Sequence, residues 1–447
     1  MESVDRGSQF KKTFIDFRQM SEFVKAPLVF TKAEGLYYWD ESGKKYFDAI
    51  GGVFVASLGH RHPALLEALH KQAERITFAP PLHGSTDIAL DYIDKLGKVS
   101  PENLNYIKTF SGGSEANESV IKFSRQYFKQ TGFPQKYKII NQYLGYHGGT
   151  LATVAASGGA DRKAKFEPEM PGFIKVFSPK QLRKHFSTWE ETCRFTAGLY
   201  EEVIINESPD TVAAIMLEPI SNTAGIITPT KEFYEIIRKT CDKYNVLMIF
   251  DEVLTGFGKT GNLFSAQTYG VIPDVISSGK GMCSGVLPTG VTMMRENYAD
   301  VFYGKSEDNI QFMHGHTFAG NPLVAAVGSA VLDIIEKEKL LGKVRENGQY
   351  LDAKLEGLKK TGVIKEIRGQ AMLKGVELDM DAIAGNDPKK IHKFGEAMKS
   401  TALKNGLVMR INPDWFAVGP ALTIDHKGID EMVGLIESTL TQVLGEF

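Results

Sequence analysis

The chain has 447 residues and a formal net charge of −2, with 43% hydrophobic and 24% charged residues. A compact domain usually holds roughly 100–200 residues, so this length predicts two domains with ample apolar material for their cores. The near-neutral charge excludes the clustered positive surface that nucleic acids and anionic membranes require, and we expect a small-molecule partner.

The cysteines and the N-terminus argue against several special classes of protein. Cys193, Cys241 and Cys283 are widely separated and lack the CxxC spacing of a zinc site, so we expect reduced, buried thiols and no metal. The first residues, MESVDRGSQFKKTF, lack the apolar core of a signal peptide. No run approaches the roughly 18 apolar residues of a membrane span. A cytoplasmic location is therefore expected.

A central segment of alternating strands and helices dominates the chain. Residues 36–47 precede it and read as a strand of a smaller sheet. Between residues 106 and 295, short β-rich runs alternate with helical patterns at 115–130 and 231–244, which predicts a mainly parallel sheet covered on both faces. The seven predicted strands are 106–110, 137–141, 173–177, 213–217, 246–250, 275–277 and 290–294.

The two flanking segments are predicted to form one small domain. After the central segment, residues 321–356 read as long helices and 373–378 as another strand of the smaller sheet. We assign residues 1–60 and 326–447 to a small α+β domain and residues 61–325 to the large domain. No Pro/Gly-rich linker separates them, so we expect close packing and a ligand site in the cleft between them.

Lys280 is the first candidate for a functional residue. The segment DVISSGKGMCSG places it directly after an apolar strand, between Gly279 and Gly281. Small neighbours let a bulky ligand approach the lysine amine. Most lysines lie on solvated surfaces, so this segment alone leaves a surface role open.

Asp251 is the second candidate. The segment NVLMIFDEVLTGFGKTG contains an apolar strand that ends in Asp251 and Glu252. Ligands of open α/β sheets bind at the carboxyl ends of strands, so a carboxylate there is expected to face the site. The 29-residue separation from Lys280 accommodates a crossover and the next parallel strand. The alternative is that Asp251 caps a following helix.

A glycine-rich turn supplies the third candidate. The segment TFSGGSEANESVIKF leads from a strand through Ser111, Gly112, Gly113 and Ser114 into a helix. Free N–H groups at a helix start, together with the helix dipole, suit a phosphate. The turn matches neither the P-loop nor the GxGxxG pattern, and plain turn chemistry is the alternative.

With these three segments the chain resembles the class III aminotransferases, pyridoxal-phosphate enzymes of fold type I that include ornithine, 4-aminobutyrate and omega-amino-acid transaminases. The resemblance runs from about Leu36 to the C-terminus, and DEVLTGFG and SGKG are its most specific parts. It implies an α/β fold with a seven-stranded, mostly parallel sheet and a homodimer with shared active sites. It also implies transfer of an amino group from a primary amine or amino acid to a 2-oxo acid, of the pyruvate or 2-oxoglutarate type, by a ping-pong mechanism.

The resemblance also implies roles for the candidate residues. Lys280 would hold pyridoxal 5'-phosphate (PLP) as a Schiff base and move the proton, while Asp251 would pair with the ring nitrogen. Gly112, Gly113 and Ser114 would bind the phosphate, assisted by Thr317 from the partner subunit.

Four further residues are assigned to the cofactor site by the same resemblance. Tyr146 would stack on the cofactor, with His147 beside it, and Glu218 would lie near the phenolic oxygen. Val253, two residues after Asp251, would also contact the cofactor. The alternatives are a core aromatic for Tyr146 and a surface salt bridge for Glu218.

Two residues are assigned to the substrate. Arg410 matches the position from which relatives bind a substrate carboxylate, which the planar guanidinium can grip with two hydrogen bonds. The alternative is an arginine at a strand end that reaches to solvent. Phe54 falls where relatives place a pocket aromatic.

The chain departs from the family pattern in two places. Many relatives have Asn-Ser-Gly-Ser where this chain has Ser-Gly-Gly-Ser at 111–114, which changes one phosphate donor. After Glu218 and Pro219 many relatives continue with Gln-Gly, whereas this chain reads ISNTAG. A contact on that side of the cofactor is therefore expected to differ.

Three alternative functions remain to be compared. The same scaffold houses ammonia-lyases and phospholyases, which expel a leaving group, and extra cations for a phosphate or phosphonate would favour them. A Rossmann oxidoreductase lacks support because no GxGxxG opens the first helix. A catalytically silent scaffold would be expected to lose Lys280 or Asp251, and both are present.

Overall fold

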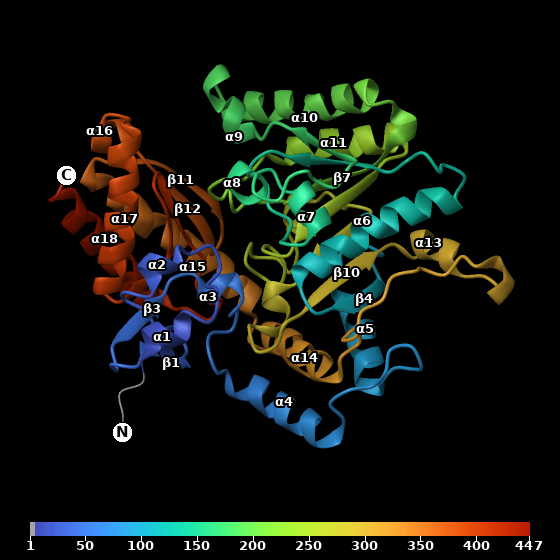
Figure 1. Cartoon of the computed structure of the whole chain (residues 1–447), viewed down its shortest axis with the longest axis horizontal. Coiled ribbons are helices and arrows are strands. Elements are labelled where there is room, and N and C mark those ends of the chain that lie inside the picture. Colours follow the sequence, from blue (N-terminus) through green and yellow to red (C-terminus); the bar gives the residue numbers. More distant parts are fainter. Residues whose placement is uncertain (1–4) are drawn as a thin grey trace.

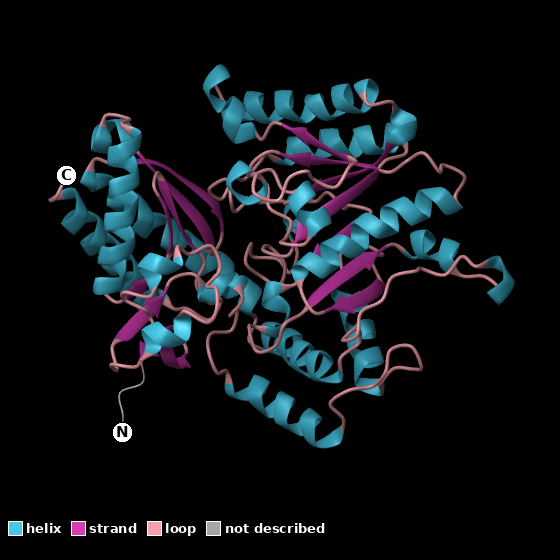
Figure 2. Ribbon diagram, viewed as in Figure 1, coloured by secondary structure: helices cyan, strands magenta, loops and turns pink. Residues whose placement is uncertain are grey.

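The computed structural model describes residues 5–447. In Figure 1 a large sheet with its helices occupies the right of the molecule, and elements from both chain ends lie together at the left. Figure 2 shows helices on both sides of the central strands. This layering agrees with the expected α/β architecture.

The central sheet has seven strands in the order β4–β10–β9–β8–β7–β5–β6. All neighbours are parallel except β10, which runs antiparallel to both β4 and β9. The seven predicted strands are confirmed, with ends that differ by at most two residues: β4 (Tyr106–Phe110), β5 (Lys138–Gln142), β6 (Phe173–Val176), β7 (Val212–Leu217), β8 (Leu247–Glu252), β9 (Val275–Ser278) and β10 (Gly290–Met294).

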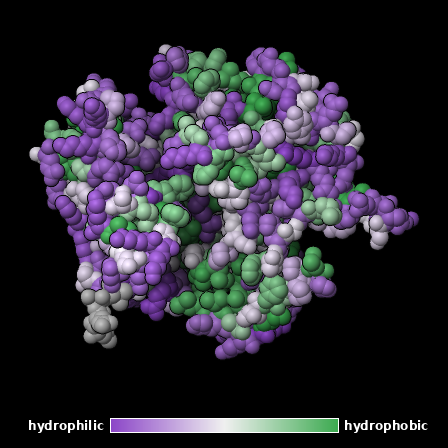
Figure 3. All heavy atoms as spheres, viewed as in Figure 1, coloured by the Kyte–Doolittle hydropathy of each residue, from purple (hydrophilic) through white to green (hydrophobic). Residues whose placement is uncertain are grey.

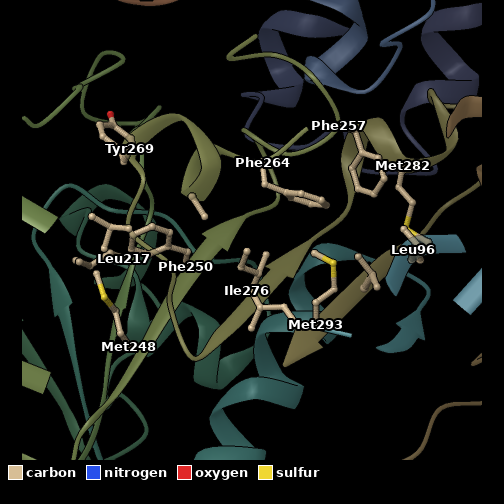
Figure 4. Packing of buried hydrophobic residues seen from close by; sticks show 14 of the residues in the cluster. Leu96, Leu217, Met248, Phe250, Phe257, Phe264, Tyr269, Ile276, Met282 and Met293 are labelled. Carbon is tan, nitrogen blue, oxygen red and sulfur yellow. The ribbon is translucent and has the colours of Figure 1, made fainter. Parts of the chain in front are cut away.

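Strands β7 and β8 are apolar throughout because both faces of the sheet are covered. Along β8, Met248 and Phe250 point into one core, and Leu247 and Ile249 into the core on the opposite face. Figure 4 shows Met248 and Phe250 beside Leu217 in the first of these cores. That core is covered by α5 (Asp87–Val99), α10 (Trp189–Asn206), α11 (Lys231–Tyr244) and α14 (Pro322–Lys337), and the opposite one by α6 (Gly113–Gln130).

The helix predicted at 231–244 is confirmed as α11, and its ends follow from local chemistry. The Thr230 side chain accepts a hydrogen bond from the Phe233 N–H and caps the first turn. Asn245 ends the helix with a φ of +50°, a left-handed conformation that asparagine tolerates. The helix predicted at 115–130 begins two residues earlier, at Gly113.

The part built from both chain ends contains two four-stranded sheets rather than one smaller sheet. Residues 36–47 do not form a single strand, because the turn at Gly43 (φ +83°), where Asp40 accepts from the Ser42 N–H, divides them into two. The first sheet is β1 (Phe30–Glu34), β2 (Tyr37–Asp40), β3 (Lys45–Asp48) and β13 (Leu407–Val408); the second is β11 (Ile364–Gln370), β12 (Leu373–Leu378), β15 (Trp415–Val418) and β14 (Arg410–Asn412).

The two chain ends meet in the first of these sheets, where β13 pairs in parallel with β3. The long helices predicted at 321–356 are α14 and α15 (Leu340–Glu356). Buried side chains of α14 belong to the large core, whereas Val344 and Leu351 of α15 belong to the core of the small part. Leu340, the first residue of α15, still belongs to the large core, so the chain passes from one core to the other within the first turn of α15. The boundaries at residues 60 and 325 stay predictions.

The remaining helices are short, except α4 in the large part and α17 and α18 in the small part. None of the helices among residues 5–447 combines the length and the apolar character needed to cross a membrane. Cys193, Cys241 and Cys283 are free and buried, as expected. The bounds are α1 (Arg6–Phe10), α2 (Met20–Phe23), α3 (Gly51–Phe54), α4 (Pro63–Arg75), α7 (Leu151–Ala156), α8 (Ala160–Lys163), α9 (Pro179–Leu182), α12 (Ser265–Tyr269), α13 (Glu296–Ala299), α16 (Met380–Ala384), α17 (Pro388–Lys404) and α18 (His426–Leu444).

A buried lysine ties the amino ends of three strands together. Lys136, which is 2% exposed, lies just before β5. Its Nζ donates to the carbonyls of Pro209 and Val212 at the start of β7, and of Tyr244 and Asn245 before β8, at 3.0–3.1 Å. Burial lowers the pKa of this amine. The Lys136 side chain therefore links the amino ends of β5, β7 and β8, on the opposite side of the sheet from their carboxyl ends.

We expect Lys136→Leu to lower the free energy of unfolding by roughly 2–4 kcal/mol, because four buried carbonyl groups lose their donor. Urea unfolding followed by circular dichroism measures this. Lys129→Leu, on the exposed end of α6, is the matched control and should change the value by less than about 0.5 kcal/mol. Equal effects of the two substitutions would contradict the assigned role.

Candidate active site

A cavity of about 400 Å³ lies at the carboxyl ends of the central strands. Its volume lies within the range of small-molecule sites. The turn before α6 and the ends of β5, β7, β8 and β9 each contribute to it. Predicted residues that line this cavity are Gly112, Gly113, Ser114, Tyr146, His147, Glu218, Asp251, Val253 and Lys280.

Asp251 is the penultimate residue of β8 and is only 4% exposed. Its Oδ2 accepts hydrogen bonds from Asn117 Nδ2 at 2.7 Å and from the His147 ring at 2.8 Å, and its Oδ1 accepts from the Val253 N–H at 3.0 Å. No helix begins at this point of the described chain, since a turn follows β8, so the capping alternative is wrong. A buried carboxylate held in this way is preorganised to face a positive group.

Glu252, the next residue, points to the other side of the strand. Its carboxylate accepts from the N–H groups of Ser265 and Ala266 at 2.6 and 2.8 Å, at the start of α12. Burial raises the pKa of Glu252 to about 7. The two adjacent acids therefore separate into one that lines the cavity and one that anchors a neighbouring helix.

Lys280 follows β9 with a φ of +23°, a strained value for a side chain with a Cβ. Such strain is often found at functional sites. Burial lowers the pKa of the Lys280 amine, while the negative charges of Asp251 and Glu218 oppose this shift. Within residues 5–447 the amine has no hydrogen-bond or ion-pair partner. An unpaired amine in a cavity, with a lowered pKa, is suited to nucleophilic and base chemistry.

The glycines around Lys280 are required by close packing. A Cβ at Gly281 would lie 2.7 Å from the Ser57 hydroxyl, and one at Gly279 would lie 3.0 Å from the Thr289 carbonyl oxygen. The backbone on both sides of Lys280 is thus closely packed, which leaves no room for larger residues at positions 279 and 281.

The turn that precedes α6 opens onto the cavity. A Cβ at Gly112 would meet no atom within 4 Å, so this residue faces open space. Within residues 5–447, the N–H groups of Gly113 and Ser114 find no acceptor outside the helix, as expected for the first turn of a helix. The Ser114 hydroxyl accepts from the Gly149 N–H at 3.2 Å. These donors can receive an anion at the positive end of the α6 dipole.

The Glu218 side chain is hydrogen-bonded to the backbone of Tyr146, and both residues line the cavity. Glu218 Oε2 accepts from the Tyr146 N–H at 2.8 Å and from the Ser221 hydroxyl at 3.1 Å. Burial raises the pKa of Glu218. The carboxylate makes no ion pair among the described residues, so the salt-bridge alternative is wrong. Tyr146 lines the cavity rather than an apolar core.

The remaining three predicted residues do not line the cavity of this chain. Phe54, with a φ of +63°, turns its ring into a small apolar cluster with Trp415, and the cavity is lined by the neighbouring Val55 instead. Thr317 is exposed, which leaves its predicted role in a partner subunit a prediction. Arg410 lies on β14 near the cavity and has no ion pair among the described residues.

Sequence reasoning missed several polar residues of the site. Asn117 donates to the His147 carbonyl oxygen at 2.6 Å as well as to Asp251, and its Oδ1 accepts from the Ser277 hydroxyl. Its position four residues after Gly113, within an otherwise apolar face of α6, was the available signal. Asn222 also lines the cavity, and its buried Oδ1 has no hydrogen-bond partner in the described chain. It falls in the segment that departs from the family pattern.

Comparison with known proteins decides the family. The model of the family "Aminotransferase class-III" matches residues 20–440. The chain belongs to this family. A relative named putrescine–pyruvate aminotransferase, from Pseudomonas aeruginosa, is 31% identical over 443 residues, covering 96% of this chain and 93% of its own.

Solved structures of omega-transaminases have the same fold as this class-III aminotransferase. An (S)-enantioselective omega-transaminase from Thermomicrobium roseum superposes with a TM-score of 0.92 at 30% identity, covering 99% of this chain and 100% of the other. The omega-transaminase of Pseudomonas jessenii, solved in complex with PMP, has a TM-score of 0.92 at 29% identity, covering 99% and 98%. The predictions of fold type I and of an enzyme that transfers amino groups to keto acids are confirmed.

Gly113, at the start of α6, packs tightly against the residue that follows β8. A Cβ at Gly113 would lie 2.7 and 2.9 Å from the two methyl carbons of Val253. We expect Gly113→Ala to lower the free energy of unfolding by roughly 1–3 kcal/mol through overpacking. In a Val253→Ala background the same change should cost far less, with a coupling above about 1 kcal/mol in chemical unfolding. Strictly additive effects would show that the two residues do not press on each other.

Proposed function

We propose that this aminotransferase uses PLP, bound to Lys280, and that Lys280 and Asp251 are its catalytic residues. The observation that carries the proposal is the placement of the two side chains at the carboxyl ends of the adjacent parallel strands β8 and β9, in one cavity. The cofactor, when bound, supplies an electron sink for the carbanion formed at the substrate. Binding, orientation and proton movement are supplied by the residues of the chain.

The residues present fit PLP. The first turn of α6, at Gly112, Gly113 and Ser114, would hold its phosphate, and Asp251 would face its ring nitrogen. Tyr146 and Val253 line the cavity between these ends, where a flat ring would lie. The open space at Gly112 and the unpaired Lys280 amine support this assignment. Glu218 and the unpaired Asn222 Oδ1 remain available for the polar edge of the ring.

Asp251 would keep the cofactor ring protonated by a charge held in place from two sides. Asn117 and His147 both donate to its Oδ2 and the Val253 N–H donates to its Oδ1, so the carboxylate is oriented before any ligand arrives. A preorganised charge of this kind contributes more than a mobile one in water. His147 thus acts as a positioning residue.

Lys280 would move the proton at the substrate carbon that bears the amine. Its pKa is lowered by burial, which favours the neutral amine needed for accepting a proton. The close packing at Gly279 and Gly281 fixes the backbone that carries the Lys280 side chain. Both features support a general base at this position.

A lyase on the same scaffold is the second candidate. The relatives compared with this chain are named for transamination, which favours an amine or amino acid as donor and a 2-oxo acid of the pyruvate or 2-oxoglutarate type as acceptor. The two reactions differ in the step after proton removal, because a lyase expels a leaving group from the substrate.

We also propose a homodimer in which Thr317 of one subunit completes the phosphate site of the other. Large apolar side chains lie exposed near Thr317: Phe318 is 55% exposed and Met313 66%. Phe318 packs edge-on against Phe78 at 6.0 Å, and Leu82 in the same loop is 91% exposed. The face drawn in Figure 3 also carries a gathering of hydrophobic residues at its lower centre. Exposed apolar groups of this extent are typical of subunit interfaces.

The proposed reaction is tested by one half-reaction. Purified enzyme loaded with PLP is mixed anaerobically with amines, amino acids and aminophosphonates, without an oxo acid, and the cofactor spectrum is followed. We expect one stoichiometric conversion to the aminated cofactor and no release of ammonia. Repeated ammonia release with an unchanged spectrum would show a lyase.

Lys280→Ala should abolish both turnover and the absorbance of covalently bound cofactor, and normal turnover by this variant would refute the assignment.

The role of Asp251 is tested by removing only its charge. Asp251→Asn should retain the cofactor but slow proton removal roughly 100-fold or more, since a preorganised charge is lost. Stopped-flow spectroscopy of the half-reaction measures the rate. Asp242→Asn, on the exposed face of α11, is the matched control. An unchanged rate in Asp251→Asn would mean that the ring nitrogen is paired elsewhere.

A further inference from the structure

Two arginines lie beside Tyr146 without any carboxylate partner in the described chain. The guanidinium of Arg162, on α8, stands 4.9 Å from the centre of the Tyr146 ring. Arg410, on β14, stands 5.3 Å from the centre of the Trp415 ring. Neither makes a hydrogen bond or an ion pair within residues 5–447, and the Nε of Arg410 is buried and unpaired. Both side chains are only partly exposed.

The two cations are close enough to affect each other and the catalytic lysine. Burial lowers the pKa of Arg410, and the positive charge of Arg162 lowers it further. The charge of Arg410 in turn lowers the pKa of Lys280. The charges of Glu218 and Asp161 oppose the lowering of the Arg410 pKa, but neither acid forms an ion pair with Arg410 in the described chain. Two like charges in a partly buried place, without a directly paired acid, destabilise the protein. A bound anion would remove this cost.

The N-terminal segment covers Arg162 from outside. Phe17, with a φ of +59°, places its ring 4.3 Å from the Arg162 guanidinium. Arg162 therefore lies between two aromatic rings, Phe17 and Tyr146, which hold its planar group by cation–π contacts and leave its N–H edge free. The nearby acids Asp16 and Asp161 affect the pKa values of Tyr146 and Arg410 but pair with neither arginine.

We propose that Arg162 and Arg410 together bind the anionic end of the amine substrate, and that this end is a three-oxygen group, a sulfonate or a phosphonate. This inference rests on the proposed function and names its substrate class: short amines whose far end carries the anion. Tyr146 lines the cavity that holds Lys280 and also contacts Arg162, which lies outside that lining. A short substrate whose anion binds the two arginines would extend past Tyr146 with its amine toward Lys280.

Stoichiometry favours three oxygens over two. Each guanidinium presents a fork of N–H donors that matches two acceptor oxygens. A carboxylate has only two oxygens in one plane, so two forks must share both of them. A tetrahedral sulfonate or phosphonate offers three oxygens in different directions, so two forks that approach from different sides share only one oxygen. Although extra cations also suit a lyase acting on a phosphonate, the anaerobic half-reaction separates the two chemistries.

The test uses four donors of matched length on the PLP-loaded enzyme: 2-aminoethanesulfonate, 2-aminoethylphosphonate, 3-aminopropanoate and the neutral propylamine. The rate of cofactor conversion per donor concentration is measured for the wild type, Arg162→Gln, Arg162→Lys and the surface control Arg194→Gln, whose arginine is 58% exposed. We expect Arg162→Gln to slow the sulfonate and phosphonate by roughly 10- to 100-fold and propylamine by less than about 3-fold. Arg162→Lys should recover part of the loss.

Two results would overturn the proposal. Equal loss for all four donors, or no loss in Arg162→Gln, would show that Arg162 does not contact the anion. A wild-type preference for 3-aminopropanoate over both three-oxygen donors would overturn the assigned group.

A binding measurement separates this inference from the proposed function. Ethanesulfonate and propanoate lack the amine and cannot react, so calorimetric titration reports the anion site alone. We expect ethanesulfonate to bind the wild-type holoenzyme more tightly than propanoate and to lose roughly 10-fold or more in Arg162→Gln. If no donor converts the cofactor but this pattern holds, the proposed function fails and the anion site stands. Absence of ethanesulfonate binding to the wild type would refute the site.

Discussion

The buried carboxylate of Asp251 is the interaction on which the geometry of the site depends. A negative charge that is 4% exposed is costly unless strong donors surround it. Asn117 of α6 and His147 of the segment after β5 supply those donors, and Ser277 of β9 fixes the Asn117 amide from its other side. One charge thus holds a helix, a loop and two strands in register.

The same arrangement couples the two ends of the cavity that we assign to the cofactor. Gly113 stands against Val253, two residues beyond Asp251, so the turn that opens α6 cannot shift without moving the strand end. An anion at the helix start and a cation at the carboxylate are then held at a set separation. Such preorganisation lets a rigid sheet edge carry chemistry that loops could not position as accurately.

The central sheet could be predicted from sequence because its strands are buried on both faces and read as uninterrupted apolar runs, as in β7 and β8. The small part was harder. Residues 36–47 resemble one strand because the turn at Gly43 interrupts the pattern only briefly, and the pairing of β13 with β3 joins segments that lie far apart in the chain. Asp251 and Lys280 were found because strand ends mark the site. Asn117 was not, because its role depends on a partner 134 residues away.

The residues that we propose for substrate selection lie on parts of the chain outside the central sheet. Arg410 comes from β14, Arg162 from the four-residue helix α8, and Phe17 from the N-terminal segment. None of these elements follows a central strand directly, so sequence patterns at the strand ends carry no information about them. This separation has a physical consequence. The proposed cofactor site is held by buried hydrogen bonds within the large core, whereas the arginines are held by aromatic contacts at its margin. Under this proposal, changes at the margin alter which amine is accepted while Asp251, Lys280 and the turn before α6 keep their positions.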